Sequence, residues 1–123
     1  MKVAINVCYG GFGLSDAAFE KLLERKGIEF EKRKGEKLAS LNLVHYYKKG
    51  RIGDDDAYLA EHDFCDGEKR ADPDLVAIIE EMDEESFGEF AELRIVEIPD
   101  DVEWQIEEYD GCEWVAEKHR TWR

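Results

Sequence analysis

The sequence predicts an α+β fold in which a mixed or antiparallel sheet is combined with two main helices. Two segments, 16–26 and 73–83, have N-cap residues and helical spacing of their apolar side chains. Short β-like runs occur near both ends of the chain, and the last three, within 93–118, are separated by turns typical of a C-terminal three-stranded meander. With 123 residues the chain is expected to form a single domain, 1–123.

The first elements are a strand, a glycine-rich turn and a helix. Residues 2–8 place Val3, Ile5 and Val7 on one face and the small or polar Ala4, Asn6 and Cys8 on the other, which is typical of a strand covered on both sides. Ser15 is a favourable N-cap for the helix 16–26, and Gly27 suits the position that follows a helix. The apolar face expected to be buried is formed by Ala18, Phe19, Leu22 and Leu23.

The middle of the chain is the part that its pattern defines least. Short strands are expected at 28–31 and within 41–47, and the glycines and aspartates of 48–56 indicate an exposed loop. We interpret 32–71 as an insertion within the domain and expect part of it to be mobile.

The second half contains clearer signals. Asp72 followed by Pro73 is a typical N-cap and first residue, so they predict the start of the second helix. Strands are expected at 93–98, 102–107 and 112–118. The Asp-Gly pair at 110 and 111 favours a tight hairpin turn between the last two strands.

The charge is strongly asymmetric. The chain has 17 Lys and Arg against 31 Asp and Glu, a net charge of −14, and residues 54–110 contain 23 acidic but only 3 basic side chains. Binding to duplex nucleic acid is therefore not expected, because phosphate contacts need a positive surface. The acidic stretch has two interpretations: a solubilising face, or a surface that binds a basic protein partner.

The cysteines and hydropathy indicate the compartment. Cys8, Cys65 and Cys112 are odd in number and widely spaced, which does not indicate a disulfide framework. No apolar run approaches the roughly 20 residues of a membrane span, and no leader peptide is visible. We therefore expect a reducing cytoplasm and no membrane partner. The HxxC spacing of His62 and Cys65 is too little to predict a metal, and no cofactor is expected.

The glycine-rich turn between the first strand and the first helix is the best candidate site. Glycines allow close approach of a ligand, and the helix N-terminus offers unpaired N–H groups to a phosphate. Aromatic and guanidinium groups could stack on a base or pair with an anion. The alternative is a tight turn whose aromatic side chains fill the core. The candidate ligand-binding residues are Tyr9, Gly10, Gly11, Phe12, Gly13, Ser15, Arg120 and Trp122.

No catalytic residues are predicted. No Ser or Cys stands in a nucleophile motif, and a solvated hairpin explains the acids of 107–110 more simply than a carboxylate pair. A hydrolase acting on a nucleotide is therefore only a third hypothesis, and we lean towards a protein that is not an enzyme.

Several motifs resemble a family of small, largely uncharacterised proteins of tailed bacteriophages. They are Cys-Tyr-Gly-Gly-Phe-Gly-Leu-Ser at 8–15, Asp-Pro-Asp-Leu-Val at 72–76, and the segments 98–104, 107–111 and 117–122. The resemblance implies a phage protein in the host cytoplasm that counters host defence. The first hypothesis is a non-enzymatic protein, with a homo-oligomer completing the pocket, that sequesters a small phosphorylated nucleotide signal. The alternative is an acidic inhibitor of a basic host defence or nucleic-acid-binding protein.

Overall fold

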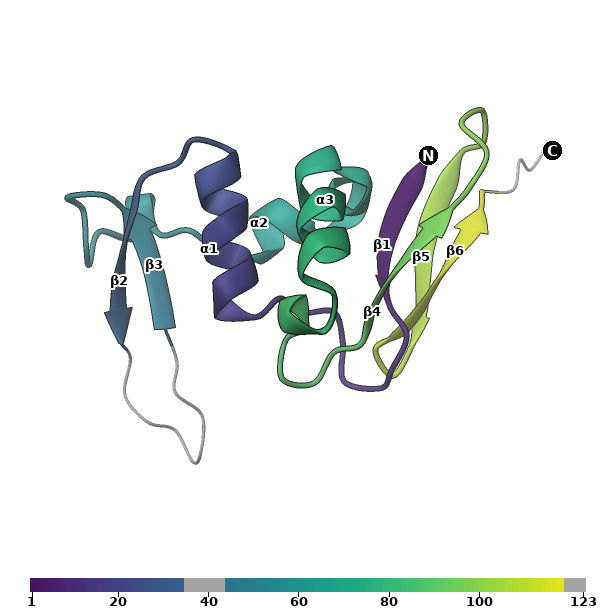
Figure 1. The fold of residues 1–123 in the computed structure, drawn as a ribbon, viewed down its shortest axis with the longest axis horizontal. Helices are drawn as coiled ribbons and strands as arrows, with labels where there is room; N and C mark the ends of the chain where they lie inside the picture. Colours follow the sequence, from purple (N-terminus) through teal and green to yellow (C-terminus); the bar gives the residue numbers. More distant parts are fainter. Residues whose placement is uncertain (35–43, 119–123) are drawn as a thin grey trace, which may run out of the picture.

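The fold is α+β, as the sequence predicts. The computed structural model describes residues 1–34 and 44–118. Within these residues the helices lie between a hairpin on one side and the remaining strands on the other (Figure 1). The strands are β1 (Lys2–Asn6), β2 (Phe30–Lys34), β3 (Val44–Lys48), β4 (Leu93–Glu97), β5 (Trp104–Tyr109) and β6 (Cys112–Glu117). The α-helices are α1 (Asp16–Arg25), α2 (His62–Cys65) and α3 (Pro73–Met82), and the 3-10 turns are η1 (Asp55–Ala57), η2 (Gly67–Ala71) and η3 (Asp83–Ser86).

The strands pair as antiparallel ladders, and one pairing differs from the prediction. β4 pairs with β1, with Val3 opposite Val96, whereas β5 pairs with β6. The three-stranded meander expected over 93–118 is therefore wrong. Residues 3–6 of β1 are buried, so this strand needs a ladder partner, and β4 meets that need. Turn signals locate strands, but they do not say which strand lies beside which.

The β5–β6 hairpin forms at the predicted turn. Asp110 and Gly111 both have positive φ, 50° and 85°, as the two central residues of a type I′ turn require. The register places Glu107 opposite Trp114, and Ile106 opposite Val115 on the other face. The hairpin predicted from the Asp-Gly pair is therefore confirmed.

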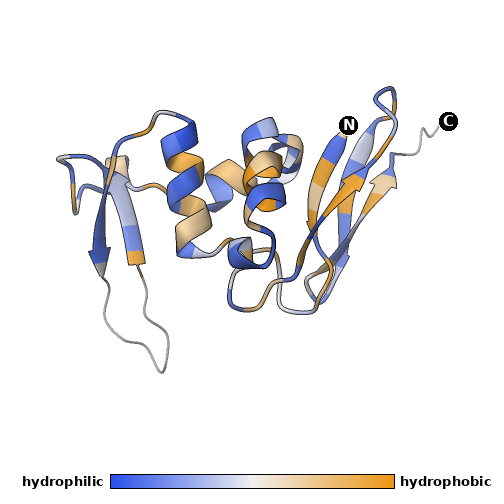
Figure 2. Ribbon diagram, in the orientation of Figure 1, coloured by the Kyte–Doolittle hydropathy of each residue, from blue (hydrophilic) through white to orange (hydrophobic). Residues whose placement is uncertain are grey.

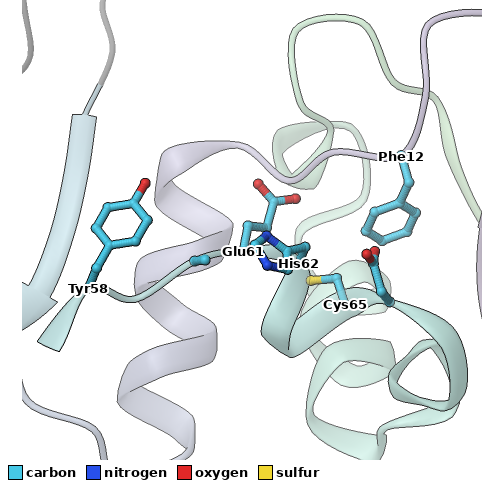
Figure 3. A pocket seen from close by; sticks show the side chains of 7 residues that line it. Phe12, Tyr58, Glu61, His62 and Cys65 are labelled. Carbon is cyan, nitrogen blue, oxygen red and sulfur yellow. The ribbon is translucent and has the colours of Figure 1, made fainter. Parts of the chain in front are cut away.

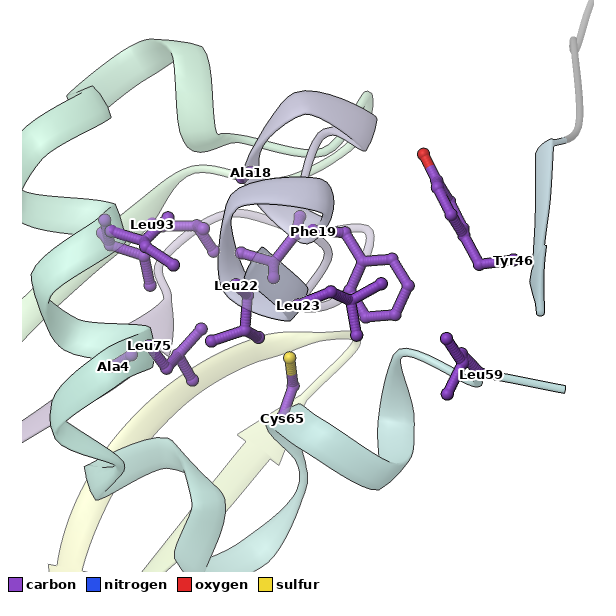
Figure 4. Packing of buried hydrophobic residues seen from close by; sticks show 13 residues of the cluster. Ala4, Ala18, Phe19, Leu22, Leu23, Tyr46, Leu59, Cys65, Leu75 and Leu93 are labelled. Carbon is purple, nitrogen blue, oxygen red and sulfur yellow. The ribbon is translucent and has the colours of Figure 1, made fainter. Parts of the chain in front are cut away.

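The core lies between α1, α3 and the strands. Figure 4 shows Leu22 and Leu23 of α1 meeting Leu75 of α3, with Tyr46 on the side of the β2–β3 hairpin. Phe19 packs edge-on against Tyr46, with ring centroids 5.0 Å apart. The buried face predicted for α1 is confirmed, because all four of its apolar residues are buried: Ala18, Phe19, Leu22 and Leu23.

Both main helices begin at the predicted caps. The Ser15 hydroxyl accepts a hydrogen bond from the Ala18 N–H at 3.2 Å, and the Asp72 carboxylate accepts one from the Asp74 N–H at 3.1 Å. Lys26, at the C-terminal end of α1, lies 2.6 Å from the Asp72 carboxylate. This pair joins the negative end of one helix dipole to the positive end of the other, which favours both charges.

Residues 44–71 contribute to the core, although their pattern defines them poorly. Tyr46, Leu59 and Cys65 are buried members of the hydrophobic cluster. Figure 2 shows why this part is hard to recognise: β2 is blue along most of its length, whereas β1 carries orange segments. The strands of the β2–β3 hairpin expose many charged side chains and bury mainly the aromatic residues of β3.

The second edge of β1 is completed by side chains. Arg70 of η2 and Glu113 of β6 form a two-pronged ion pair, with N–O distances of 2.6 and 2.9 Å, and their side chains are only 7% and 9% exposed. Arg70 also donates to the Ala4 carbonyl at 3.3 Å, and Glu113 accepts from the Asn6 N–H at 2.9 Å. The pair therefore satisfies backbone groups of β1 that a neighbouring strand would otherwise bind.

This arrangement predicts an unequal effect of two glutamate substitutions. Glu113→Ala leaves the Arg70 charge buried without a partner and should lower the free energy of unfolding by about 3–5 kcal/mol. Glu80→Ala removes the exposed ion pair with Lys2 and should change it little. Urea unfolding of both variants checks the prediction, and a loss of less than 1 kcal/mol for Glu113→Ala would contradict it.

Candidate functional site

The glycine-rich segment lies where three loops meet. The Gly10 N–H donates to the Asp110 carbonyl at 3.2 Å. A Cβ on Gly10 would lie 2.6 Å from the carbonyl oxygen of Phe90, and one on Gly111 would lie 2.3 Å from the nitrogen of Gly11. These two glycines are therefore needed for loops to touch one another. The close approach that the sequence assigns to a ligand is made in the structure by the protein's own backbone.

Asn6 fixes the same three loops from inside. It is completely buried at the end of β1. Its amide nitrogen donates to the carbonyls of Cys8 and Gly111, both at 2.7 Å, and its amide oxygen accepts from the Glu92 N–H at 2.9 Å. One side chain thus binds the loop after β1, the loop before β4 and the β5–β6 turn, which makes their arrangement rigid.

Several N–H groups of the predicted anion cradle already have acceptors. The Leu14 N–H donates to the Glu61 carboxylate at 2.8 Å, and the Ser15 N–H donates to the Ser86 carbonyl at 2.9 Å. The Gly10 N–H also has an acceptor within the protein, so three N–H groups of the segment are not available to a ligand. An external anion at the start of α1 would have to compete with Glu61.

A hollow of about 410 Å³ opens beside the segment (Figure 3). Phe12 forms one wall, and Glu61 extends from the start of α2 towards the β1–α1 loop. The lining side chains include two carboxylates and no lysine or arginine, so the hollow favours a cation over a phosphate. The lining residues are Phe12, Tyr58, Ala60, Glu61, His62, Cys65 and Asp66.

Phe12 is held in this wall by Arg70. The guanidinium carbon lies 3.8 Å from the centre of the ring, which is a close cation–π contact. Arg70 also donates to the Cys65 carbonyl. The aromatic side chain that the sequence assigns to base stacking is thus packed against the ion pair that completes β1.

Burial raises the pKa of Glu61. The Leu14 N–H opposes this shift, as does the charge of Arg70, whereas Asp16 and Asp66 add to it. A buried carboxylate with a raised pKa is costly to ionise, yet here it lies at the entrance of α1 where an anion was expected. Glu61 therefore substitutes internally for the predicted external anion.

The remaining predicted residues are placed unequally. Tyr9 is 71% exposed, and the Gly13 carbonyl accepts a hydrogen bond from the Gly88 N–H at 2.8 Å. Arg120 and Trp122 lie outside the described residues. The structure therefore brings Tyr9, Phe12 and the glycines together with loops from the C-terminal half.

The sequence analysis missed residues that shape this region. Asn6 was assigned only to a strand, although a buried polar side chain among β-branched residues is itself a signal for a hydrogen-bonding role. Phe90 and Tyr109 are 62% and 69% exposed and flank the contacts with Gly10. Exposed aromatic residues beside turns carry no periodicity, so strand and helix patterns did not find them.

The Cys65 thiol is one of the groups that line the hollow. Burial raises the pKa of the Cys65 thiol to about 12, with the charge of Glu61 adding to the shift, so this thiol is unreactive. Within residues 1–34 and 44–118 there is no group of three or more His, Cys, Asp or Glu that could hold a metal ion. None of the described helices has the length and apolar character to cross a membrane.

Comparisons with known proteins give no further identification. No protein-family model, curated protein or solved structure matches the chain. The resemblance to phage proteins therefore stays a prediction, and the functional argument rests on the geometry and the charge of this chain.

The raised pKa of Glu61 predicts a pH-dependent gain from Glu61→Gln. The folded wild type holds this proton more tightly than the unfolded chain, so its stability falls as pH rises from the ordinary glutamate pKa through the raised one. Glutamine keeps an acceptor for the Leu14 N–H but does not ionise. The free energy of unfolding of the variant relative to wild type should therefore be higher at pH 7.5 than at pH 4. Urea unfolding at both values tests this, and a difference independent of pH would contradict it.

Proposed function

We propose that this protein is a non-enzymatic interaction protein whose acidic surface binds a basic protein partner. The observation that carries the proposal is the uncompensated charge of residues 54–110. Arg70, one of the three basic residues in this stretch, is buried against Glu113, so only Lys69 and Arg94 are exposed there. Most of the acidic side chains of the same stretch are exposed. Such a surface attracts a cationic partner and repels an anionic one.

The end of α3 supports the same interpretation. Glu81 in its last turn and Glu84 and Glu85 in η3, directly after the helix, are exposed, and the last turn of the helix has no basic residue. Negative side chains at this end oppose the helix dipole and cost stability. Asp83 adds a backbone strain, with φ of 49° in a residue that is not glycine. Charges that oppose folding in this way are expected where they contribute to binding.

The resemblance suggests which class of partner to expect. For a phage protein, a basic partner in the bacterial host would be a defence protein or a nucleic-acid-binding protein, and the acidic surface would compete with its nucleic acid. This step rests on the resemblance alone, whereas the binding of a basic surface rests on the charge distribution.

Charge reversal at the end of α3 tests the proposal. Glu84→Lys with Glu85→Lys should weaken binding of a fluorescein-labelled nona-lysine peptide several-fold in low salt, because the reversal replaces two attractive charges of the acidic surface with two repulsive ones. Glu24→Lys with Glu29→Lys makes the same change in net charge. Because these residues lie outside the acidic stretch 54–110, in the last turn of α1 and just after it, this control variant should have a smaller effect. Fluorescence anisotropy measures both variants.

Salt and cellular partners complete this test. Binding should be lost on raising the salt from 20 to 300 mM, because surface electrostatics are screened. Affinity purification from bacterial cells should recover a basic protein with wild type and with the control variant, but not with the Glu84/Glu85 variant. Absence of peptide binding in low salt, or equal loss in both variants, would contradict the proposal.

Nucleotide capture is the second candidate. The observation in its favour is the hollow beside Phe12, which is large enough for part of a nucleotide. The carboxylates of Glu61 and Asp66 in that hollow and the occupied N–H groups of Leu14 and Ser15 weaken it. It therefore ranks below the acidic interaction surface.

The two candidates give opposite expectations in a nucleotide titration. If the acidic surface is the functional feature, a panel of cyclic and NAD-derived nucleotides should give no heat of binding at micromolar sensitivity in isothermal titration calorimetry. Binding of any nucleotide with a micromolar or lower dissociation constant would reverse our ranking. Chromatography of the recovered ligand then distinguishes capture from hydrolysis, since only hydrolysis alters it.

A further inference from the structure

Three exposed aromatic residues lie on the loops that Asn6 joins. We refer to Tyr9, Phe90 and Tyr109 as the aromatic tip; they are 71%, 62% and 69% exposed. In Figure 1 the loop after β1, the loop before β4 and the β5–β6 turn lie together at the lower edge of the half of the molecule that contains β1, β4, β5 and β6. Exposed aromatic residues that gather at one place are typical of interaction surfaces.

Backbone contacts establish that the three aromatic residues are neighbours. Tyr9 precedes Gly10, whose N–H donates to the carbonyl of Asp110, the residue after Tyr109. A Cβ on Gly10 would lie 3.0 Å from the Cβ of Phe90. The Cys8 thiol donates to the Phe90 carbonyl at 3.2 Å. The aromatic tip is therefore a set of adjacent positions contributed by three separate loops.

The tip is rigid before any partner binds. Asn6 is fully buried and donates to or accepts from all three loops. Gly111 adds an N–H bond to the Glu108 carboxylate at 2.7 Å, within the hairpin turn. A rigid surface loses less conformational entropy on binding, so exposed aromatic residues on it are effective anchors.

Acidic side chains flank the residues of the aromatic tip along the chain. The exposed acids next to the three aromatic residues along the chain, which we call the acidic rim, are Glu89, Glu92, Glu107, Glu108 and Asp110. Glu107 accepts a hydrogen bond from the indole N–H of Trp114 at 3.0 Å, so the outer face of the β5–β6 hairpin continues the same combination of ring and carboxylate. Aromatic faces with carboxylates beside them attract cations.

We infer that the aromatic tip and its acidic rim bind an arginine-rich segment of a basic partner. A guanidinium group stacks on aromatic faces and pairs with carboxylates through two parallel N–H groups, whereas a lysine ammonium is a compact point charge. A second copy of this chain fits less well, because two acidic rims would face each other. This inference rests on the proposed function, and it places the main contact with the basic partner at the loops that Asn6 joins.

The experiment compares two cationic peptides of equal charge. Fluorescein-labelled nona-arginine and nona-lysine are titrated with the full chain in low salt, and fluorescence anisotropy gives both affinities. We expect nona-arginine to bind roughly tenfold more tightly than nona-lysine, because two or three stacking contacts add to a charge attraction that both peptides share. A chain bearing Tyr9→Ser, Phe90→Ser and Tyr109→Ser should lose this preference.

The control is an exposed apolar residue far from the tip. Ile52 is 46% exposed in the loop after β3, and Ile52→Ser should keep the preference for arginine. The substituted tip residues are mostly exposed, so the triple variant should fold, and circular dichroism verifies this. Single tip variants measured in parallel should each lose about a twofold share of the preference.

The outcomes separate this inference from the proposed function. Equal affinity for the two peptides, with the triple variant binding like wild type, would overturn the aromatic tip as an anchor while leaving the acidic surface in place. Failure of both peptides to bind in low salt would overturn the acidic surface and the tip with it. Equal loss of the arginine preference in Ile52→Ser and in the triple variant would also overturn the inference.

Discussion

The buried ion pair between Arg70 and Glu113 allows β1 to be an internal strand with a ladder partner on only one edge. It satisfies the Ala4 carbonyl and the Asn6 N–H on the other edge and holds the Phe12 ring. Because each charge is almost fully buried, neither residue is tolerable without the other. η2, the glycine-rich segment and the β5–β6 hairpin are thus positioned through one pair of side chains.

The sequence predicts those parts of the fold that depend on neighbours along the chain. The caps Ser15 and Asp72 and the type I′ turn at Asp110 and Gly111 were all found, because each is a local interaction with a specific residue preference. The pairing of β4 with β1 was not predicted, since the choice between β1 and β5 as its partner depends on which residues are buried after folding. Arg70 was also hidden, because a buried arginine is recognisable only through its distant partner.

The candidate site shows the same division. The segment 9–15 was correctly recognised as a special backbone, but glycines show only that something approaches closely, not what it is. Here Gly10 faces another loop and Leu14 faces the Glu61 carboxylate. The sequence does not show that positions 14 and 61 are close in space. The same glycine-rich pattern is therefore compatible with an internal acceptor, such as Glu61, and with an external anion. The charge asymmetry needed no such distance and therefore carries the functional argument.

The position of the partners of β1 has a consequence for biosynthesis. The ribosome makes β1 long before β4, and Glu113 lies 107 residues beyond Asn6 in the chain. Until β4 is made, Val3 and Ile5 have no ladder partner, and a nascent strand of this kind is prone to aggregate. Chains that end between β4 and β6 keep the ladder but lack Glu113, which leaves Arg70 and the Asn6 N–H without their partner, so proteolytic quality control should remove them.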